Sequence, residues 1–501
     1  MLSVLRLPFS ASTADAHQRR FEGVCGLRFS SAHPWPVGAV WTQVSFHFLD
    51  CAFMYDVTVA PLRLTSTARI FSMKIVLASY GTRGDVEPCI ALGRELSRRG
   101  HEVRVAVSPN FVDFAEAAGL AAVAYGPDPK HWQDLHREVL TRLSRFFRKP
   151  RELVKLGRED WALLRQCWEE TSRTLKSLAQ GADLLLSGVI GEEAAANVAE
   201  YYGIPFATLH TFPIRPSGQL APLVPTALAR NAAAASEWFG WPLTKRLEDA
   251  QRVALGLPKA KRPPSRRIAA SGALEIQAYD SVCFPGLQSE WAQWRSQRPF
   301  VGALTVAQPT PSDGEIQAWV NEGTPPIFFG FGSTPVKSPA DTLAMISDAC
   351  AHLGERALVC AAETDFGDMS RFENLKVVGA ANYTAVFPAC RAVVHHGGGG
   401  TTAAGLRAGV PTLILSTWFD QALWGKQVER LKVGKTRRFA SVSLETLVAD
   451  LRDILNADYV ARARDIAAHM TSAGESVAVA ADHLESLVNA AQTSRASDNK
   501  D

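Results

Sequence analysis

The chain contains 501 residues with a formal net charge of +3; 47% of them are hydrophobic and 21% are charged. This composition is typical of a globular enzyme, and the length exceeds what one core usually serves, so we expect two domains of roughly 200 residues each. The small net charge predicts no nucleic-acid partner. The eight cysteines lack the CxxC spacing of zinc and redox sites, which favours a reducing, cytoplasmic location. The sequence has no run of ~20 apolar residues, so we expect no membrane span.

Residues 1–72 differ in character from the rest of the chain. Prolines interrupt them, and no helical or strand period persists. An apolar stretch from Met73 to Ala78 then begins as many α/β domains do. We therefore expect residues 1–72 to be a disordered extension or a mis-assigned start, with Met73 as the true first residue. A targeting peptide is the alternative, because the segment has several arginines and few acids.

Strands and helices alternate from Met73 to residue 306, which we expect to form the first domain. Alternation at this spacing predicts a parallel sheet with helices on both faces. The expected strands are residues 75–78, 102–107, 121–124, 183–187 and 205–209. One expected helix contains Ile90, Leu92 and Leu96 and ends at Gly100, and two more cover residues 111–118 and 192–202. No internal repeat is evident.

Residues 307–323 have the composition of an interdomain linker, and a second α/β series follows over residues 324–487. Its expected strands are residues 326–333, 356–360, 376–378, 392–394 and 412–415. We expect residues 488–501 to be a disordered polar tail. Ligands of open parallel sheets bind beyond the carboxyl ends of the strands, so two such domains would share a cleft.

Four glycines, residues 397–400, lie between the strand that ends at Val394 and a helix that runs to Gly409. Without side chains they let backbone amides approach a ligand, and a helix N-terminus favours an anion. Thr401 and Thr402 add hydroxyl donors, and His396 adds an imidazole. A tight turn without a ligand is the alternative, and we expect His395 to pack or hydrogen-bond beneath the loop.

The stretch from His396 to Gln421, read as H-G-G-G-G-T-T, G-V-P and D-Q, resembles the donor-binding signature of inverting glycosyltransferases of the two-domain GT-B fold, the UDP-glycosyltransferase superfamily. The segment from Gly81 to Pro88 resembles the matching N-terminal loop of bacterial members. The chain from Met73 to Leu487 is most similar to actinobacterial glycopeptidolipid and antibiotic glycosyltransferases (families 1 and 28). The resemblance implies an α/β GT-B fold with two Rossmann-like parallel-sheet domains facing a central cleft.

The resemblance also implies which residues bind the nucleotide-diphosphate sugar. It places His396 and Thr401 on the phosphates, and Asp420 and Gln421 on hydroxyls of the sugar. The full expected donor set comprises Thr82, Arg83, Gly332, Ser333, His396, Gly398, Gly400, Thr401, Thr402, Asp420 and Gln421. For Gly332 and Ser333 the alternative is a plain turn, and for Asp420 it is a helix N-cap.

Asp85 is the expected general base, because an acceptor hydroxyl must lose its proton as it attacks the anomeric carbon. Bacterial relatives with this loop carry the role on the matching aspartate. The alternative is that Asp85 caps the helix that contains Pro88. Arg83 is expected to pair with a phosphate or with Asp85.

Two departures from the family leave the nucleobase open. Ala404 stands where plant members hold the ribose with a glutamate, and Val378 stands near the position of their uracil-stacking tryptophan. Both dTDP-linked and UDP-linked donors are therefore expected candidates. The chain has no Asp-x-Asp motif, so we expect no metal ion and no other cofactor.

The segment from Arg142 to Arg158 mixes bulky apolar residues with clustered positive charge, as surfaces that touch anionic lipids do. It predicts peripheral contact with the inner face of the plasma membrane, where a hydroxyl-bearing lipid or natural-product acceptor would be met. A solvated helix face is the alternative. An epimerase acting on the nucleotide sugar alone, or a binding module without catalysis, are the competing functions.

Overall fold

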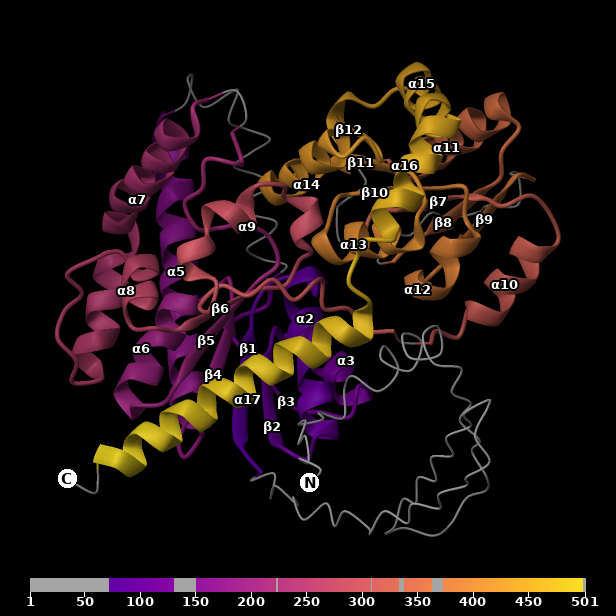
Figure 1. Ribbon diagram of the computed structural model, residues 1–501. Helices are drawn as coiled ribbons and strands as arrows, with labels where there is room; N and C mark the ends of the chain where they lie inside the picture. The colour runs from indigo at the N-terminus through magenta and orange to yellow at the C-terminus, as the bar shows by residue number, and fades with distance from the viewer. Residues whose placement is uncertain are drawn as a thin grey trace, which may run out of the picture. The chain divides into compact units, whose positions relative to one another are not determined.

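The computed structural model describes residues 72–129, 150–221, 224–307, 309–332, 338–362 and 373–498. All of these belong to one compact unit of the chain, residues Phe71–Asp501. It contains two six-stranded sheets that follow one another along the sequence (Figure 1). Every described ladder between the named strands is parallel, so consecutive strands need crossover connections. Helices supply them within each sheet, apart from the connection between β8 and β9, most of which lies outside the described residues.

The first sheet has the strand order β3-β2-β1-β4-β5-β6. β1 pairs with β2 on one side and with β4 on the other, in the register Ile75 with Leu184. The chain therefore reverses its direction of travel across the sheet between β1 and β4, and the loops beyond these strands flank a crevice. The strands are β1 Lys74–Ser79, β2 Glu102–Val107, β3 Ala121–Ala124, β4 Leu184–Gly188, β5 Phe206–His210 and β6 Leu274–Gln277.

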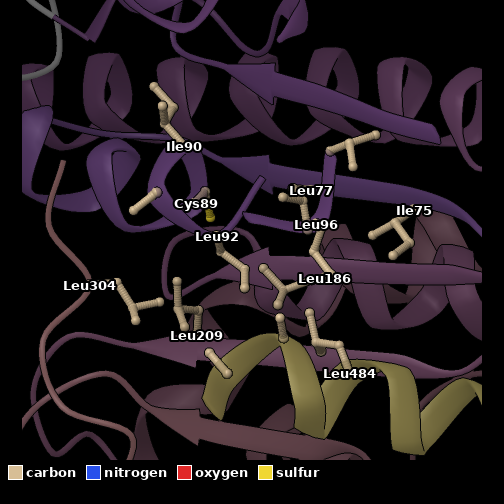
Figure 2. Close-up of a cluster of buried hydrophobic side chains, with 14 of the residues drawn as sticks. Ile75, Leu77, Cys89, Ile90, Leu92, Leu96, Leu186, Leu209, Leu304 and Leu484 are labelled. Atoms are coloured by element: carbon tan, nitrogen blue, oxygen red, sulfur yellow. The ribbon is translucent and has the colours of Figure 1, made fainter. Parts of the chain in front are cut away.

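Helices cover both faces of this sheet. Ile75 and Leu77 of β1 point to one face, in a core with Leu92 and Leu96 of α2 (Figure 2). Val76 and Ala78 point to the other face, in a core with residues of α5 and α6. The helices of this half are α2 Arg83–Arg98, η2 Pro109–Phe111, α3 Val112–Ala117, α5 Pro150–Leu178, α6 Glu192–Tyr202, α7 Thr226–Ala254, α8 Pro264–Ala270, η3 Ser281–Cys283, α9 Leu287–Glu290 and η4 Ala292–Trp294.

The second sheet has the order β12-β11-β10-β7-β8-β9, and its reversal point lies between β7 and β10. Its strands are β7 Ile327–Gly330, β8 Ala357–Cys360, β9 Leu375–Val378, β10 Ala392–His395, β11 Thr412–Ser416 and β12 Gly434–Arg438. Its helices are α10 Asp313–Asn321, α11 Pro339–Leu353, α12 Tyr383–Val386, η5 Phe387–Ala389, α13 Gly399–Ala408, α14 Phe419–Arg430, η6 Phe439–Ser441, α15 Leu444–Ile454 and α16 Ala457–Ala467. The glycine run follows β10 at this reversal point.

The C-terminal helix corrects two expected boundaries. α17 runs from Ala473 to Asp498, so the described part of the expected disordered tail is helical. Its Leu484 lies in the core of the first sheet, next to Leu186 and Leu209 (Figure 2). Arg99, the C-cap residue of α2, also pairs with Asp482 at 2.6 Å. Residues 473–487, expected in the second domain, therefore stabilise the first, because a helix rich in alanine can pack closely on α2.

The expected linker over residues 307–323 contains α10 rather than an extended connection. Ile316 and Val320 of α10 are buried in a core with Phe328 of β7. The spacing of these two side chains by four residues puts them on one helix face. This helix therefore belongs to the second sheet.

Candidate active site

Asp85 lies in the first turn of α2, directly beyond the end of β1. Its Oδ2 accepts hydrogen bonds from the Thr82 backbone N–H at 2.8 Å and from the Thr82 hydroxyl at 3.0 Å. Gly81 has φ +130°, and a Cβ there would lie 2.4 Å from Asp85 Oδ2, so only glycine fits. Asp85 therefore closes a capping box at the start of α2, and its carboxylate has a fixed position.

Burial raises the pKa of Asp85 to about 6, although the hydrogen bonds from Thr82 oppose the shift. The carboxylate of Asp420, from the second half, adds a smaller like-charge contribution. The side chain keeps intermediate solvent exposure. Asp85 is thus mostly ionised at neutral pH and can accept a proton. Both described hydrogen bonds end on Oδ2, which leaves Oδ1 for that task.

Arg83 has a different partner from the two expected for it. Its Nε donates to Glu87 Oε2 at 2.8 Å, and its guanidinium lies 4.8 Å from the centroid of the Phe114 ring. The other oxygen of Glu87 accepts the backbone N–H of Val306 at 3.0 Å. The expected pairing of Arg83 with Asp85 is therefore wrong, while a contact with phosphate stays a prediction.

The glycine run forms the N-terminus of α13, with Gly398 as the N-cap residue. The His396 imidazole fits between two glycines: a Cβ on Gly332 would lie 2.7 Å from its Cε1, and a Cβ on Gly398 would lie 2.7 Å from its Nε2. Gly332 also has φ +56°. The first amides of α13 have no partner within a helix, so they can bind an anion. Ser333 lies outside the described residues.

The two histidines before the glycines differ in role. Burial lowers the pKa of His396 to about 4, so its imidazole is neutral at pH 7 and can act as a hydrogen-bond donor rather than as a cation. Among the described atoms, its Nδ1 is buried without a hydrogen-bond partner. His395 is fully buried, and its Nδ1 accepts the Gly397 N–H at 2.9 Å. The expectation that His395 supports the loop from below is confirmed.

Thr401 and Thr402 are neighbours with different surroundings. Thr402 is fully buried, and its hydroxyl donates to the Gly398 carbonyl at 2.9 Å. Thr401 keeps intermediate exposure at the helix N-terminus. Thr402 therefore holds the shape of the loop, and Thr401 is the better placed of the two to reach a ligand.

Asp420 and Gln421 begin α14, beyond the end of β11. Gln421 is buried, and its Oε1 accepts the backbone N–H groups of Thr417 at 2.8 Å and Trp418 at 3.0 Å. Gln421 thus caps the helix with its oxygen. Asp420 is the second residue of α14 and not its N-cap, so that alternative is wrong. Burial raises the pKa of Asp420, whose side chain keeps intermediate exposure.

Contacts between the two halves position these loops within the unit. A Cβ on Gly399 would lie 3.2 Å from the carbonyl oxygen of Thr211, which follows β5. Arg407 of α13 donates to the Ala303 carbonyl at 2.7 Å and to Thr305 Oγ1 at 3.2 Å. The start of α13 therefore faces the loop after β5, on the same side as Asp85.

A buried charge cluster behind β5 was not expected from the sequence. Arg215 pairs with Glu192 and with Glu275, each at 2.7 Å, and His210 Nε2 lies 3.1 Å from Glu192 Oε2. Arg215 holds the pKa of Glu192 at about 2 against the effect of burial. Next to it, burial raises the pKa of Glu193 to about 7. Adjacent glutamates at a helix start usually indicate dipole compensation, so no sequence signal singled them out.

The described part of the chain has no group of three or more His, Cys, Asp or Glu side chains placed to hold a metal ion. None of its helices combines the length and the hydropathy needed to cross a bilayer.

Comparison with known proteins identifies the family. Residues 75–180 match the Glycosyltransferase family 28 N-terminal domain, and residues 344–487 match the Erythromycin biosynthesis protein CIII-like C-terminal domain. An uncharacterized glycosyltransferase of Mycobacterium tuberculosis is 52% identical over 422 residues, which cover 84% of this chain and all of the relative. Another from Mycobacterium leprae is 53% identical over 414 residues, covering 82% and 96%.

Solved structures show the same fold. The glycosyltransferase of kitacinnamycin matches with a TM-score of 0.65 at 18% identity, covering 83% of this chain and 99% of that one. The calicheamicin glycosyltransferase CalG4 matches with a TM-score of 0.62 at 18% identity, covering 84% and 99%. The two parallel sheets thus form a GT-B fold. The chain belongs to the glycosyltransferases of the UDP-glycosyltransferase type, and it is an enzyme of that class.

Proposed function

We propose that this glycosyltransferase inverts the anomeric centre and moves a deoxyhexose such as rhamnose from a nucleoside diphosphate to a hydroxyl group, without a metal ion. The acceptor is a lipid, a peptidolipid or another secondary metabolite, in cell-envelope glycolipid biosynthesis. The observation that carries the proposal is Asp85: a fixed carboxylate with one available oxygen, poised near neutral pH at the end of β1.

The proposed reaction uses one group from each half. The acceptor oxygen forms a bond to the anomeric carbon while Asp85 Oδ1 takes its proton. The bond from that carbon to the diphosphate oxygen breaks, and the diphosphate leaves with the electron pair. Charge grows on the leaving oxygen, and the amides at the start of α13, with the neutral His396 and Thr401, stabilise it where it develops. Asp420 would bind hydroxyls of the sugar through its carboxylate oxygens.

Either dTDP or UDP fits the proposal, and two observations favour dTDP. By the family resemblance, Ala404 stands where plant members hold the ribose, and Val378 stands near the position of their uracil-stacking tryptophan. Two of the structural neighbours, VinC and SsfS6, were solved with dTDP or thymidine diphosphate, at TM-scores of 0.51 and 0.52.

A lipid hydroxyl is the proposed acceptor because a relative acts on one. A sterol 3-beta-glucosyltransferase of Arabidopsis thaliana is 28% identical over 412 residues, which cover 79% of this chain and 65% of the relative. Of the basic segment expected to contact the membrane, residues 142–149 lie outside the described residues, and residues 150–158 begin α5. A cytoplasmic enzyme working at the inner face of the plasma membrane stays part of the proposal.

Two successive experiments test the proposal: the first measures donor binding, and the second measures sugar transfer. A thermal-shift screen with dTDP-sugars and UDP-sugars in EDTA should raise the melting temperature with the true donor, because ligand binding stabilises the folded state. Transfer to a lipid hydroxyl should then proceed in EDTA, and NMR should show an inverted anomeric configuration. Conversion of the donor sugar without any acceptor would favour the epimerase instead. A requirement for a divalent ion, or retention of configuration, would contradict the proposed chemistry.

A further inference from the structure

Helix α7 presents an apolar stripe to solvent. Its most exposed side chains include Leu228 at 61%, Phe239 at 83% and Leu243 at 69%. Such exposure is unusual for large apolar residues that gather on one element. We call the set Leu228, Trp238, Phe239, Leu243 and Val253 the α7 stripe.

The spacing of Leu228, Phe239, Leu243 and Val253 places them on one face of the helix, and Trp238 borders that face. Phe239 follows Leu228 by 11 residues, which is three helical turns, and Leu243 follows one turn later. Arg246 shares this face, since it lies 18 residues, or five turns, after Leu228. The opposite face packs inward: Gln251 is buried and accepts a hydrogen bond from Trp168 of the neighbouring helix α5 (Figure 1). Helix α7 is therefore amphipathic, and the side chains of the α7 stripe are not needed to fill the core.

The charge around the α7 stripe is strongly positive. Residues 224–270 contain nine Lys and Arg against three Asp and Glu, a net charge of +6, whereas the whole chain carries +3. The three acids all pair with cations of the same segment: Glu237 with Arg266, Glu248 with Arg267 and Asp249 with Lys245.

Three exposed cations beside the stripe have no such partner. Arg246, Lys261 and Arg262 are exposed, and no ion pair of the described residues includes them. Lys261 and Arg262 follow Ala260, whose carbonyl accepts a hydrogen bond from Lys245 Nζ at 2.9 Å. That bond holds the loop after α7 against the helix at Lys245, the residue before Arg246.

Aromatic side chains lie at the border between the apolar and charged parts. The Trp238 and Trp241 rings contact edge to face at 6.0 Å. The Lys245 ammonium lies 4.7 Å from the Trp241 ring, and the Arg266 guanidinium lies 5.9 Å from the Trp238 ring. Tryptophan beside Lys and Arg, with a bare apolar face, is the composition that places a helix at a lipid headgroup boundary.

We propose that the α7 stripe docks the enzyme on an anionic lipid bilayer, with the apolar side chains inserted and Arg246, Lys261 and Arg262 on the headgroups. Charge complementarity selects this occupant, because the patch has unpaired cations and no unpaired acid among the described residues of the segment. A twofold dimer on this face would instead bring like charges of two copies together. This docking depends neither on the sugar nor on the catalytic steps proposed above.

Flotation of the full chain with phospholipid vesicles tests the docking. We expect the protein to float with vesicles of phosphatidylcholine mixed with phosphatidylglycerol, to stay behind with phosphatidylcholine alone, and to dissociate as salt is raised. Phe239→Asp with Leu243→Asp should lower vesicle partitioning at least about tenfold. Arg246→Glu with Lys261→Glu removes two cations from exposed positions, and it should lower partitioning by about fivefold or more for each one.

Matched variants away from the stripe serve as controls. Val123→Asp alters an exposed apolar residue on β3, at the sheet edge opposite β6, and Arg94→Glu with Arg452→Glu removes two exposed cations elsewhere. Both controls should float like the wild type. Equal flotation of the wild type and both stripe variants would overturn the proposal, as would wild-type binding that ignores lipid charge. A dimer that the stripe variants dissociate, with no vesicle binding, would overturn it as well. No outcome requires donor or acceptor, so loss of transfer activity would not be confused with loss of docking.

Discussion

Asp85→Asn separates the two roles that the structure gives to this residue. An asparagine Oδ1 can accept the same two hydrogen bonds from Thr82, so the start of α2 should keep its cap. The amide nitrogen then replaces the oxygen that would take the acceptor's proton. Loss of a general base typically costs 10²–10⁴-fold in rate, or about 3–5 kcal/mol of barrier. We expect that loss in kcat, with donor affinity nearly unchanged.

The pH dependence follows from the pKa of Asp85, which burial raises to about 6. The base works only when ionised, so wild-type kcat/KM should fall about tenfold for each pH unit below that value. The residual activity of Asp85→Asn should lack this inflection. A wild-type profile without it, or an Asn variant with wild-type turnover, would remove Asp85 as the base.

The same substitution should stabilise the fold at alkaline pH. Burial raises the pKa of Asp85 from 3.8 to about 6, so the ionised carboxylate is the unfavourable form in the folded state. Two pKa units correspond to at most about 3 kcal/mol, and the partial exposure of the side chain reduces this. The cost is absent below the unfolded pKa and is complete once the pH has risen through the folded value. Urea unfolding should show Asp85→Asn more stable than wild type at alkaline pH and equal to it near pH 4; a variant less stable at alkaline pH would contradict the reasoning.

Three further predictions concern the loop and the C-terminal helix. Gly398→Ala should lower the melting temperature and abolish donor binding, because its Cβ would lie 2.7 Å from the loop imidazole, whereas Gly400→Ala, with 3.9 Å to its nearest neighbour, should melt like wild type. Thr401→Val should weaken donor binding in calorimetry without loss of stability, while Thr402→Val should cost about 1 kcal/mol in unfolding through its lost hydrogen bond; the reverse pattern would exchange their roles. Leu484→Ala should cost about 2–5 kcal/mol, and a neutral effect would show that α17 does not stabilise the first sheet.

The strands with continuous apolar runs were predictable from the sequence because both faces of a parallel sheet are buried. Residues 183–187 and 205–209 were predicted as strands and lie within one residue of β4 and β5, in which every residue is buried, and residues 192–202 match α6. Two strands were missed. β12 reads GKTRR and forms the edge of its sheet, where side chains need less burial. β6 contains Glu275, which is fully buried and stable there only because Arg215 and Arg298 pair with it.

The positions of the site loops were also predictable, since each follows a parallel strand, and the loops after β1, β7 and β10 lie at the reversal points of their sheets. The sequence did not reveal which polar side chains are available to a ligand and which are used in contacts within the protein. Arg83 pairs with Glu87, and Thr402 and Gln421 bond to their own loops. Ser, Thr, Asp and Gln at a helix start satisfy capping and ligand-binding patterns alike. Only hydrogen-bond geometry distinguishes them.

The two halves of the site share one structural arrangement, and it determines how variants of each half are to be interpreted. Each half places a helix N-terminus beyond a parallel strand, and each fixes that terminus with a side chain three residues into it: Asp85 in α2 and Gln421 in α14. A Gln421 variant that binds donor weakly and melts early therefore reports a displaced helix start. An Asp420 variant that binds weakly with unchanged melting reports a lost contact to the sugar, because its carboxylate does not form the cap. Asp85 alone carries both roles, so its conservative replacement by asparagine is the substitution that isolates chemistry from structure.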